Sequence, residues 1–204
     1  MTTTRTRAVL VALTATAAVA LTACGGDDSA GASHASHSAA AGATASASAG
    51  THNAQDVAFA QTMIPHHRQA LEMASLAADR ASSAQVKDLA ARIEKAQDPE
   101  INTMTGWLKA WGEDVPMAGM DHSGHRGMAG MMSGKDMTML KQAKGKDFDT
   151  MFLTMMVQHH RGAVEMAGTE QAKGAYAPAT SMAGSIVTGQ NAEIKEMNTL
   201  LGKG

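Results

Sequence analysis

The sequence predicts an all-α fold, a four-helix bundle made of two duplicated helical hairpins that are joined by one long crossover. The first observation is an internal repeat, because residues 56–108 align with residues 149–201 without a gap at a spacing of 93 residues. The second is that residues shared by the two copies recur at the spacing of one face of an α-helix. The third is that a long glycine-rich segment separates the copies, while the loop within each copy is short.

Residues 1–23 are interpreted as a lipoprotein signal peptide. Arg5 and Arg7 precede an apolar run of about 15 residues, which is too short for a transmembrane helix of about 20 residues. The run ends in Leu21-Thr22-Ala23-Cys24, which resembles a bacterial lipobox. We therefore expect a lipid on Cys24 that anchors the protein to the outer face of the cell membrane. An ordinary secretory signal cut nearby is the alternative, and it would leave a free thiol.

Residues 24–53 are expected to form a disordered tether. They are rich in Ala, Gly and Ser and contain no apolar residue larger than Ala beyond Cys24, so they cannot build a core. Three histidines in this stretch could hold metal loosely, but we interpret them as solvated side chains: His34, His37 and His52.

The duplicated part, residues 54–204, is expected to fold as helices over 54–80, 84–110, 147–173 and 177–202, with a crossover over 111–146. Short loops with one long crossover are the connectivity of a ferritin-like bundle. Pro99 is expected to kink or restart the second helix, with Asp98 as its N-cap. Arg68 and Glu72 are expected to pair with each other on a solvated helix face.

The amino-acid composition excludes several classes of function. The 204 residues include 17 Met and 9 His but one Cys, with a net charge of −2. This charge argues against a nucleic-acid binder, which would carry a basic surplus. The single Cys excludes a disulfide framework and a cysteine-rich metal site. The methionine and histidine surplus points to metal chemistry.

Two histidine pairs are the main candidate metal ligands. His66-His67 recurs as His159-His160, and both pairs lie on core-facing stripes that should approach each other near the pseudo-two-fold axis of the bundle. The flanking methionines are Met63, Met73, Met156 and Met166. The alternative is that each histidine is a core residue hydrogen-bonded to Glu100, Glu193, Gln97 or Gln190. The repetition in register, with Met on both sides, favours metal binding.

The donor types favour copper, with Cu(I) first and Cu(II) or Ag(I) as further candidates. Thioethers are soft ligands that suit Cu(I), and imidazole accepts copper as well. A di-iron bundle would instead need Glu-x-x-His motifs, and the chain contains none.

The crossover is a second candidate metal-binding segment. Its soft ligands stand among Gly and other small residues, which suits a chelating loop: Met117, Met120, His122, His125, Met128, Met131 and Met132. A methionine-rich lid packed over the bundle is the alternative. Met137 and Met139 are assigned to a short helix that begins after Ser133, and both are expected to pack.

The doubled Met-x-x-His-His-x-x-Ala-x-x-Met-Ala signature and the Gln-x-x-Glu-Ile-x-x-Met run resemble bacterial secreted proteins grouped as domain-of-unknown-function family 305. The resemblance covers about residues 54–202. It implies a ferritin-like bundle, and some members are periplasmic copper-binding proteins that help to resist copper. By motif, the four histidines and their Met neighbours would carry that role.

Three functional hypotheses follow. The first, which we favour over an enzyme, is an extracytoplasmic copper buffer or chaperone in metal homeostasis or resistance. It would meet the membrane through its lipid anchor only, would not bind nucleic acid, and could deliver metal to a protein partner. The second is a metal-dependent oxidase or hydrolase that uses the histidines with Glu100 and Glu193. The third is a metal-free helical module for partner binding.

Overall fold

The computed structural model describes residues 50–117 and 129–203. The predicted signal peptide, Cys24 and the tether up to residue 49 lie outside the described residues, as do Met120, His122, His125 and Met128. The helices are α1 (Ala54–Ser75), α2 (Ala77–Arg80), α3 (Ala84–Trp111), α4 (Gly134–Gln142), α5 (Gly145–Lys173) and α6 (Ala177–Leu200). None of these helices is long and apolar enough to cross a membrane.

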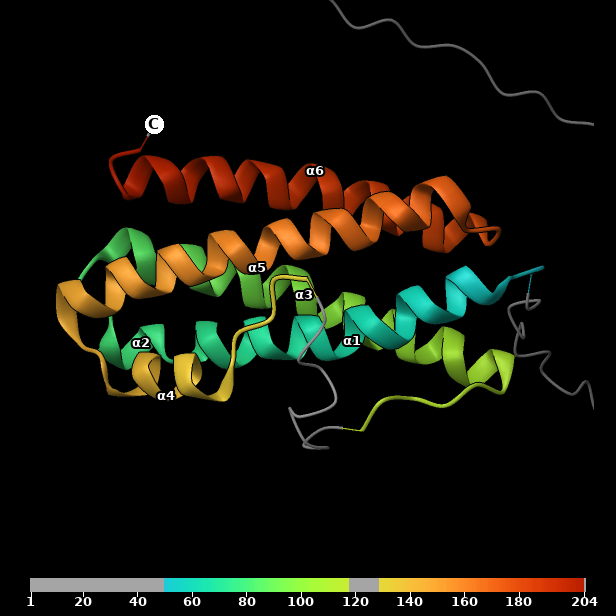
Figure 1. The fold of residues 1–204 in the computed structure, drawn as a ribbon, viewed down its shortest axis with the longest axis horizontal. Coiled ribbons are helices and arrows are strands. Elements are labelled where there is room, and N and C mark those ends of the chain that lie inside the picture. The colour runs from blue at the N-terminus through green and yellow to red at the C-terminus, as the bar shows by residue number, and fades with distance from the viewer. Residues whose placement is uncertain (1–49, 118–128, 204) are drawn as a thin grey trace, which may run out of the picture. The chain divides into compact units, whose positions relative to one another are not determined.

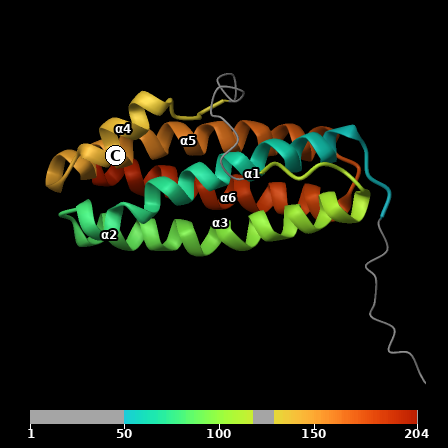
Figure 2. The same ribbon diagram turned by 90° about the horizontal axis from the view of Figure 1, so that it is seen from below.

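Four long helices form an all-α bundle, as predicted. α1 and α3 make one antiparallel hairpin and α5 and α6 the other (Figure 1). Figures 1 and 2 together place α1 beside α5 on one side of the bundle and α3 and α6 on the opposite side. α3 ends at Trp111 and α5 begins only at Gly145, with α4 as the one helix among the described residues between them, so the single long crossover is confirmed.

Two details of the helices differ from the prediction. The first predicted helix is interrupted at Leu76, which separates α1 from α2. α3 is one continuous helix of 28 residues that begins after Ser83, so Pro99 does not restart it and Asp98 is not an N-cap. Pro99 has no N–H to donate to the carbonyl of Lys95, one turn earlier in the helix. Both residues are exposed, so this carbonyl can accept a hydrogen bond from water. The buried stripe on the other face of α3 keeps the helix packed on both sides of the proline.

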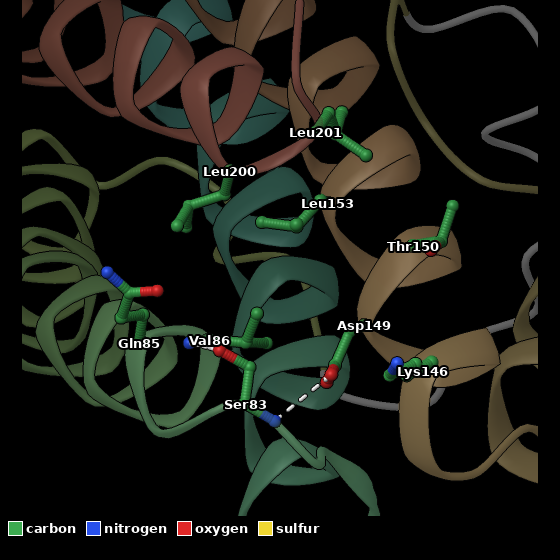
Figure 3. Close-up of a pocket in the computed structure, with 9 residues that line it drawn as sticks. All are labelled: Ser83, Gln85, Val86, Lys146, Asp149, Thr150, Leu153, Leu200 and Leu201. Atoms are coloured by element: carbon green, nitrogen blue, oxygen red, sulfur yellow. Dashed lines mark hydrogen bonds between the residues drawn. The ribbon is translucent and has the colours of Figure 1, made fainter.

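Reciprocal carboxylate contacts tie the two hairpins together. Asp56, at the start of α1, accepts hydrogen bonds from the backbone N–H groups of Ala175 and Tyr176 in the α5–α6 loop, at 3.1 and 3.0 Å. Asp149, its equivalent in α5, accepts from Ser82 N–H at 3.1 Å. It also accepts from Ser83 N–H at 3.0 Å (Figure 3). The aspartate of each copy thus binds backbone N–H groups in the interhelical loop of the other copy. This shared role explains why the aspartate recurs in both copies.

A buried glutamate lies beside one of these carboxylates. Glu170 in α5 is fully buried and neighbours Asp56. Burial, reinforced by Asp56, raises the pKa of Glu170 to about 7. Burial acts in the same direction on Asp56, but hydrogen bonds from the Asn53 and Tyr176 N–H groups outweigh it and lower the pKa of Asp56. Glu170 is therefore a neutral carboxyl group beside the Asp56 carboxylate below about pH 7.

The last residues of the predicted tether belong to the bundle. His52 stacks on Trp111 of α3 with ring centroids 4.4 Å apart, so it is not the solvated side chain that the sequence suggested. Asn53 caps α1 through its side chain, and its amide nitrogen also donates to the Lys173 carbonyl at 2.9 Å. The chain is thus fixed to the fold from His52 onward.

Candidate metal centre

The two histidine pairs meet where α1 crosses α5. All four side chains are fully buried. The rings of His66 and His159, which are equivalent residues of the two copies, are in contact with centroids 3.7 Å apart and an interplanar angle of 36°. The predicted approach of the two sites is therefore observed, with this contact at its centre.

His67 and His160 make equivalent contacts with carboxylates on the neighbouring helices. His67 Nε2 lies 2.7 Å from Glu100 Oε2 in α3, and His160 Nε2 lies 2.7 Å from Glu193 Oε2 in α6. The alternative of hydrogen-bonded core histidines therefore accounts for Nε2 of His67 and His160 but not for Nδ1 of either ring. A histidine that binds a metal through one nitrogen commonly donates its other N–H to a carboxylate, so the same contact also suits a ligand.

The Nδ1 atoms of all four histidines are buried without a hydrogen-bond partner among the described residues, and so is His159 Nε2. His66 Nε2 donates to the Ala129 carbonyl at 3.2 Å. With Nε2 as the donor in His66, His67 and His160, each Nδ1 keeps a free lone pair. A buried polar atom left unpaired costs about 1–3 kcal/mol, so a fold that keeps four such atoms on two equivalent histidine pairs needs a reason.

The central rings are neutral. Burial, followed by the neighbouring His67, lowers the pKa of His66 to about 3. Burial and then His66 lower the pKa of His159 well below its ordinary value. The neutral imidazole is the form that ligates a metal, so these two residues pay no proton-release cost near neutral pH.

A methionine precedes and another follows each histidine pair along α1 and α5. Met63, Met73 and Met156 are fully buried, and Met166 is half-buried. Met63 and Met166 belong to one hydrophobic cluster, whereas Met73 and Met156 belong to the other. Among the described residues no group of three or more His, Cys, Asp or Glu is arranged to hold a metal. Among the described residues, methionine sulfurs are the further soft donors available to a metal bound beside His66 and His159.

Both described ends of the crossover are anchored beside the histidines. Arg68 Nη1 donates to the Pro116 carbonyl at 2.6 Å. The Gln69 side chain donates to the Met132 carbonyl at 3.0 Å and accepts from the Met132 N–H at 2.7 Å. The predicted Arg68–Glu72 pair is wrong, because Glu72 pairs instead with Lys141 of α4 at 2.6 Å. Arg68 fastens the crossover rather than facing solvent alone.

Two glycines bring the end of the crossover into backbone contact with α5. A Cβ on Gly162 would lie 2.0 Å from the Ala129 oxygen and 2.8 Å from the Gly130 nitrogen. Gly130 has φ +80°, and a Cβ there would lie 2.9 Å from the His159 carbonyl oxygen. Only glycine fits either position. Sequence reasoning missed Gly162, although it stands where the first copy has Gln69, and both residues hold the crossover.

The crossover methionines have different environments. Met132 is buried at 9% exposure in a hydrophobic cluster with Met137, which agrees with a packed lid for this end of the segment. Met117 is 64% exposed and Met131 is half-buried. The short helix after Ser133 is confirmed as α4, and Met137 packs as expected. Met139 is 40% exposed, so the prediction that it packs is wrong.

A pocket of about 280 Å³ lies at the end of the bundle where α3 and α5 begin and α6 ends (Figure 3). It is lined by Ser83, Asp149 and Leu153, among others. The Asp149 carboxylate already accepts hydrogen bonds from the backbone N–H groups of Ser82 and Ser83. This polar group therefore holds the fold together and is not free for a ligand.

Comparison with known proteins identifies the family. The family model "Domain of unknown function (DUF305)" matches residues 56–201. The chain belongs to this family. A DUF305 protein from Streptomyces coelicolor, described as secreted, is 32% identical with a TM-score of 0.65 over 73% of this chain and 93% of that one. A DUF305 fragment from Deinococcus radiodurans is 30% identical with a TM-score of 0.67 over 74% of this chain and 97% of the fragment.

A further similar structure is CopM in its Cu(I)-bound form. It is 30% identical with a TM-score of 0.59, over 71% of this chain and 94% of CopM. CopM has also been solved in Cu(II)-bound, Ag-bound and apo forms. No curated protein matches the chain.

Proposed function

We propose that this protein is an extracytoplasmic copper-binding protein that takes Cu(I) as cargo at the His66–His159 contact and acts as a buffer or chaperone. The observation that carries the proposal is the set of four buried Nδ1 atoms without partners, on histidines that recur in register. Imidazole and thioether are donors that suit Cu(I). The copper- and silver-bound forms of CopM support the same choice of metal.

Different residues of the chain would bind the metal, orient the ligands and take up metal from outside. His66 and His159 would supply neutral ring nitrogens at the centre, with Met63, Met73, Met156 and Met166 as thioether donors around them. Glu100 and Glu193 would orient His67 and His160 by holding their Nε2–H groups. The crossover ligands Met117, Met120, His122, His125, Met128 and Met131 would take up metal before it reaches the buried site, whereas Met132, also a candidate from sequence, would hold the end of the crossover by packing.

The proposal places the protein outside the cytoplasmic membrane. A secretory signal over residues 1–23 and a lipid on Cys24 would hold it at the outer face of the cell membrane. In an oxidising compartment a free thiol is prone to disulfide formation, whereas methionine offers a soft donor without that reaction. The DUF305 relative that is described as secreted supports this location.

The test is a titration of the purified protein with Cu(I) against a competing chelator under anaerobic conditions. His66→Ala/His159→Ala should weaken binding by more than about tenfold, which corresponds to about 1.4 kcal/mol. The matched control is His34→Ala/His37→Ala, which removes two tether histidines and should leave the affinity unchanged. Circular dichroism would check that both variants fold.

If the His66/His159 variant binds Cu(I) as tightly as the unaltered protein, the bundle site is wrong. Tightly held Fe, Mn or Zn in protein isolated without added metal, or catalytic turnover, would instead favour the oxidase or hydrolase. A folded protein that takes up no metal would favour the partner-binding module.

A further inference from the structure

A small cavity opens between α3 and α6, on the side of the bundle opposite to the α1–α5 contact. Its volume is about 50 Å³. Equivalent residues of the two copies line it in pairs: Gln97 and Gln190, Glu100 and Glu193, Ala96 and Gly189. The cavity therefore lies on the pseudo-two-fold axis. Ala96 carries only a methyl group and Gly189 has no side chain, which leaves space for the cavity.

Two buried amides line this cavity without partners. Gln97 is 2% exposed and Gln190 is 5% exposed. Both polar side-chain atoms of Gln97 and the Oε1 atom of Gln190 lack a hydrogen-bond partner among the described residues. A buried amide left unpaired is costly, and an aliphatic residue of similar size would avoid that cost. Two such amides at equivalent positions indicate that the cavity binds something polar.

Two carboxylates line the same cavity. The side chains of Glu100 and Glu193 are 23% and 17% exposed. Each uses Oε2 for its histidine, so Oε1 takes no part in that bond. None of the described lining residues is Lys or Arg. Two carboxylates and no basic side chain from the described part of the chain line this hollow, and together they produce a negative potential that attracts a cation.

We propose that this cavity binds a divalent cation, held by the carboxylates of Glu100 and Glu193 and the amide oxygens of Gln97 and Gln190. Carboxylate and amide oxygens suit harder divalent ions, whereas the histidine and methionine donors beside α1 and α5 suit Cu(I). A volume of about 50 Å³ leaves space for an ion with bound water. The site shares Glu100 and Glu193 with the proposed Cu(I) site, where they orient His67 and His160, but it does not use His66 or His159.

The test is a titration of the purified protein with Mn²⁺, followed by the loss of the electron paramagnetic resonance signal of free Mn²⁺. We expect one saturable site per chain. Gln97→Leu/Gln190→Leu and Glu100→Gln/Glu193→Gln should each lower the Mn²⁺ affinity at least about tenfold. The matched control is Glu113→Gln/Glu165→Gln, which removes two exposed carboxylates elsewhere and should bind as the unaltered protein does.

Thermal unfolding gives a second readout. Without metal, Gln97→Leu/Gln190→Leu should unfold at a higher temperature than the unaltered protein, because two unpaired buried amides are gone. Added Mn²⁺ should raise the unfolding temperature of the unaltered protein and leave that of this variant unchanged. If Glu100→Gln/Glu193→Gln fails to fold, the Mn²⁺ affinity of Gln97→Leu/Gln190→Leu alone tests the proposed site.

The proposal is overturned if the unaltered protein shows no saturable Mn²⁺ site, or if the glutamine variant binds Mn²⁺ with the same affinity. The outcome can be separated from that of the proposed function. His66→Ala/His159→Ala should keep its Mn²⁺ affinity, and Gln97→Leu/Gln190→Leu should keep its Cu(I) affinity.

Discussion

The backbone contact between the crossover and α5 can be tested by adding a single methyl group. In Gly162→Ala the new Cβ would lie 2.0 Å from the Ala129 oxygen and 2.4 Å from its carbonyl carbon. Both atoms belong to the backbone, so no side-chain rotation relieves the clash. The crossover must move away from α5, and its hydrogen bonds to His66 and Gln69 are lost with it.

The expected change in the free energy of unfolding of Gly162→Ala follows from these hydrogen bonds. His66 makes one hydrogen bond to Ala129 and Gln69 makes two to Met132. At about 0.5–1.5 kcal/mol each, their loss costs about 1.5–4.5 kcal/mol. Alanine gains about 1 kcal/mol over glycine inside a helix. The net result is a loss of about 0.5–3.5 kcal/mol in the free energy of unfolding.

Urea denaturation followed by circular dichroism measures this change, and hydrogen exchange at the Met132 amide reports release of the crossover. Gly168→Ala is the matched control, because it lies in the same helix and a Cβ there meets nothing within 4 Å. That variant should be more stable than the unaltered protein by about 0.5–1 kcal/mol. The reasoning is refuted if Gly162→Ala is stabilised as Gly168→Ala is.

Two further predictions concern single buried polar side chains. Gln69→Leu leaves the Met132 N–H and carbonyl buried without partners, so urea denaturation should show a loss of about 2–4 kcal/mol, and a loss below about 0.5 kcal/mol would contradict the docking role. Glu170 has a pKa raised from 4.5 to about 7 in the folded state. Its stabilising contribution is therefore complete below about pH 4.5 and is lost as the pH rises towards 7. Compared with Glu170→Gln across pH 4 to 8, the unaltered protein should lose stability as the pH rises, and parallel curves would contradict the raised pKa.

Helix pairing could be predicted from sequence because it depends on local periodicity and on the repeat. The equivalent stripes around His66 and His159 placed both histidines on core faces, and two equivalent hairpins can bring such faces together. The pairing of His67 with Glu100 and of His160 with Glu193 stood among the alternatives for the same reason. These contacts follow from the symmetry of the two copies.

Contacts that break this symmetry could not be predicted. The crossover has no counterpart in the repeat, so the residues that hold it differ between the copies, as Gln69 and Gly162 do. Their partners, Ala129 and Met132, lie in a segment without periodicity. Likewise, the continuity of α3 through Pro99 depends on tertiary packing, whereas local propensity alone favoured a break.

X-ray absorption spectroscopy of the Cu(I)-loaded protein tests the central claim most directly. The account predicts a first shell of imidazole nitrogen and thioether sulfur, from which the imidazole contribution falls in His66→Ala/His159→Ala while it persists in His34→Ala/His37→Ala. A first shell that lacks imidazole, or one that is unchanged in the His66/His159 variant, would contradict copper binding at the buried histidine contact.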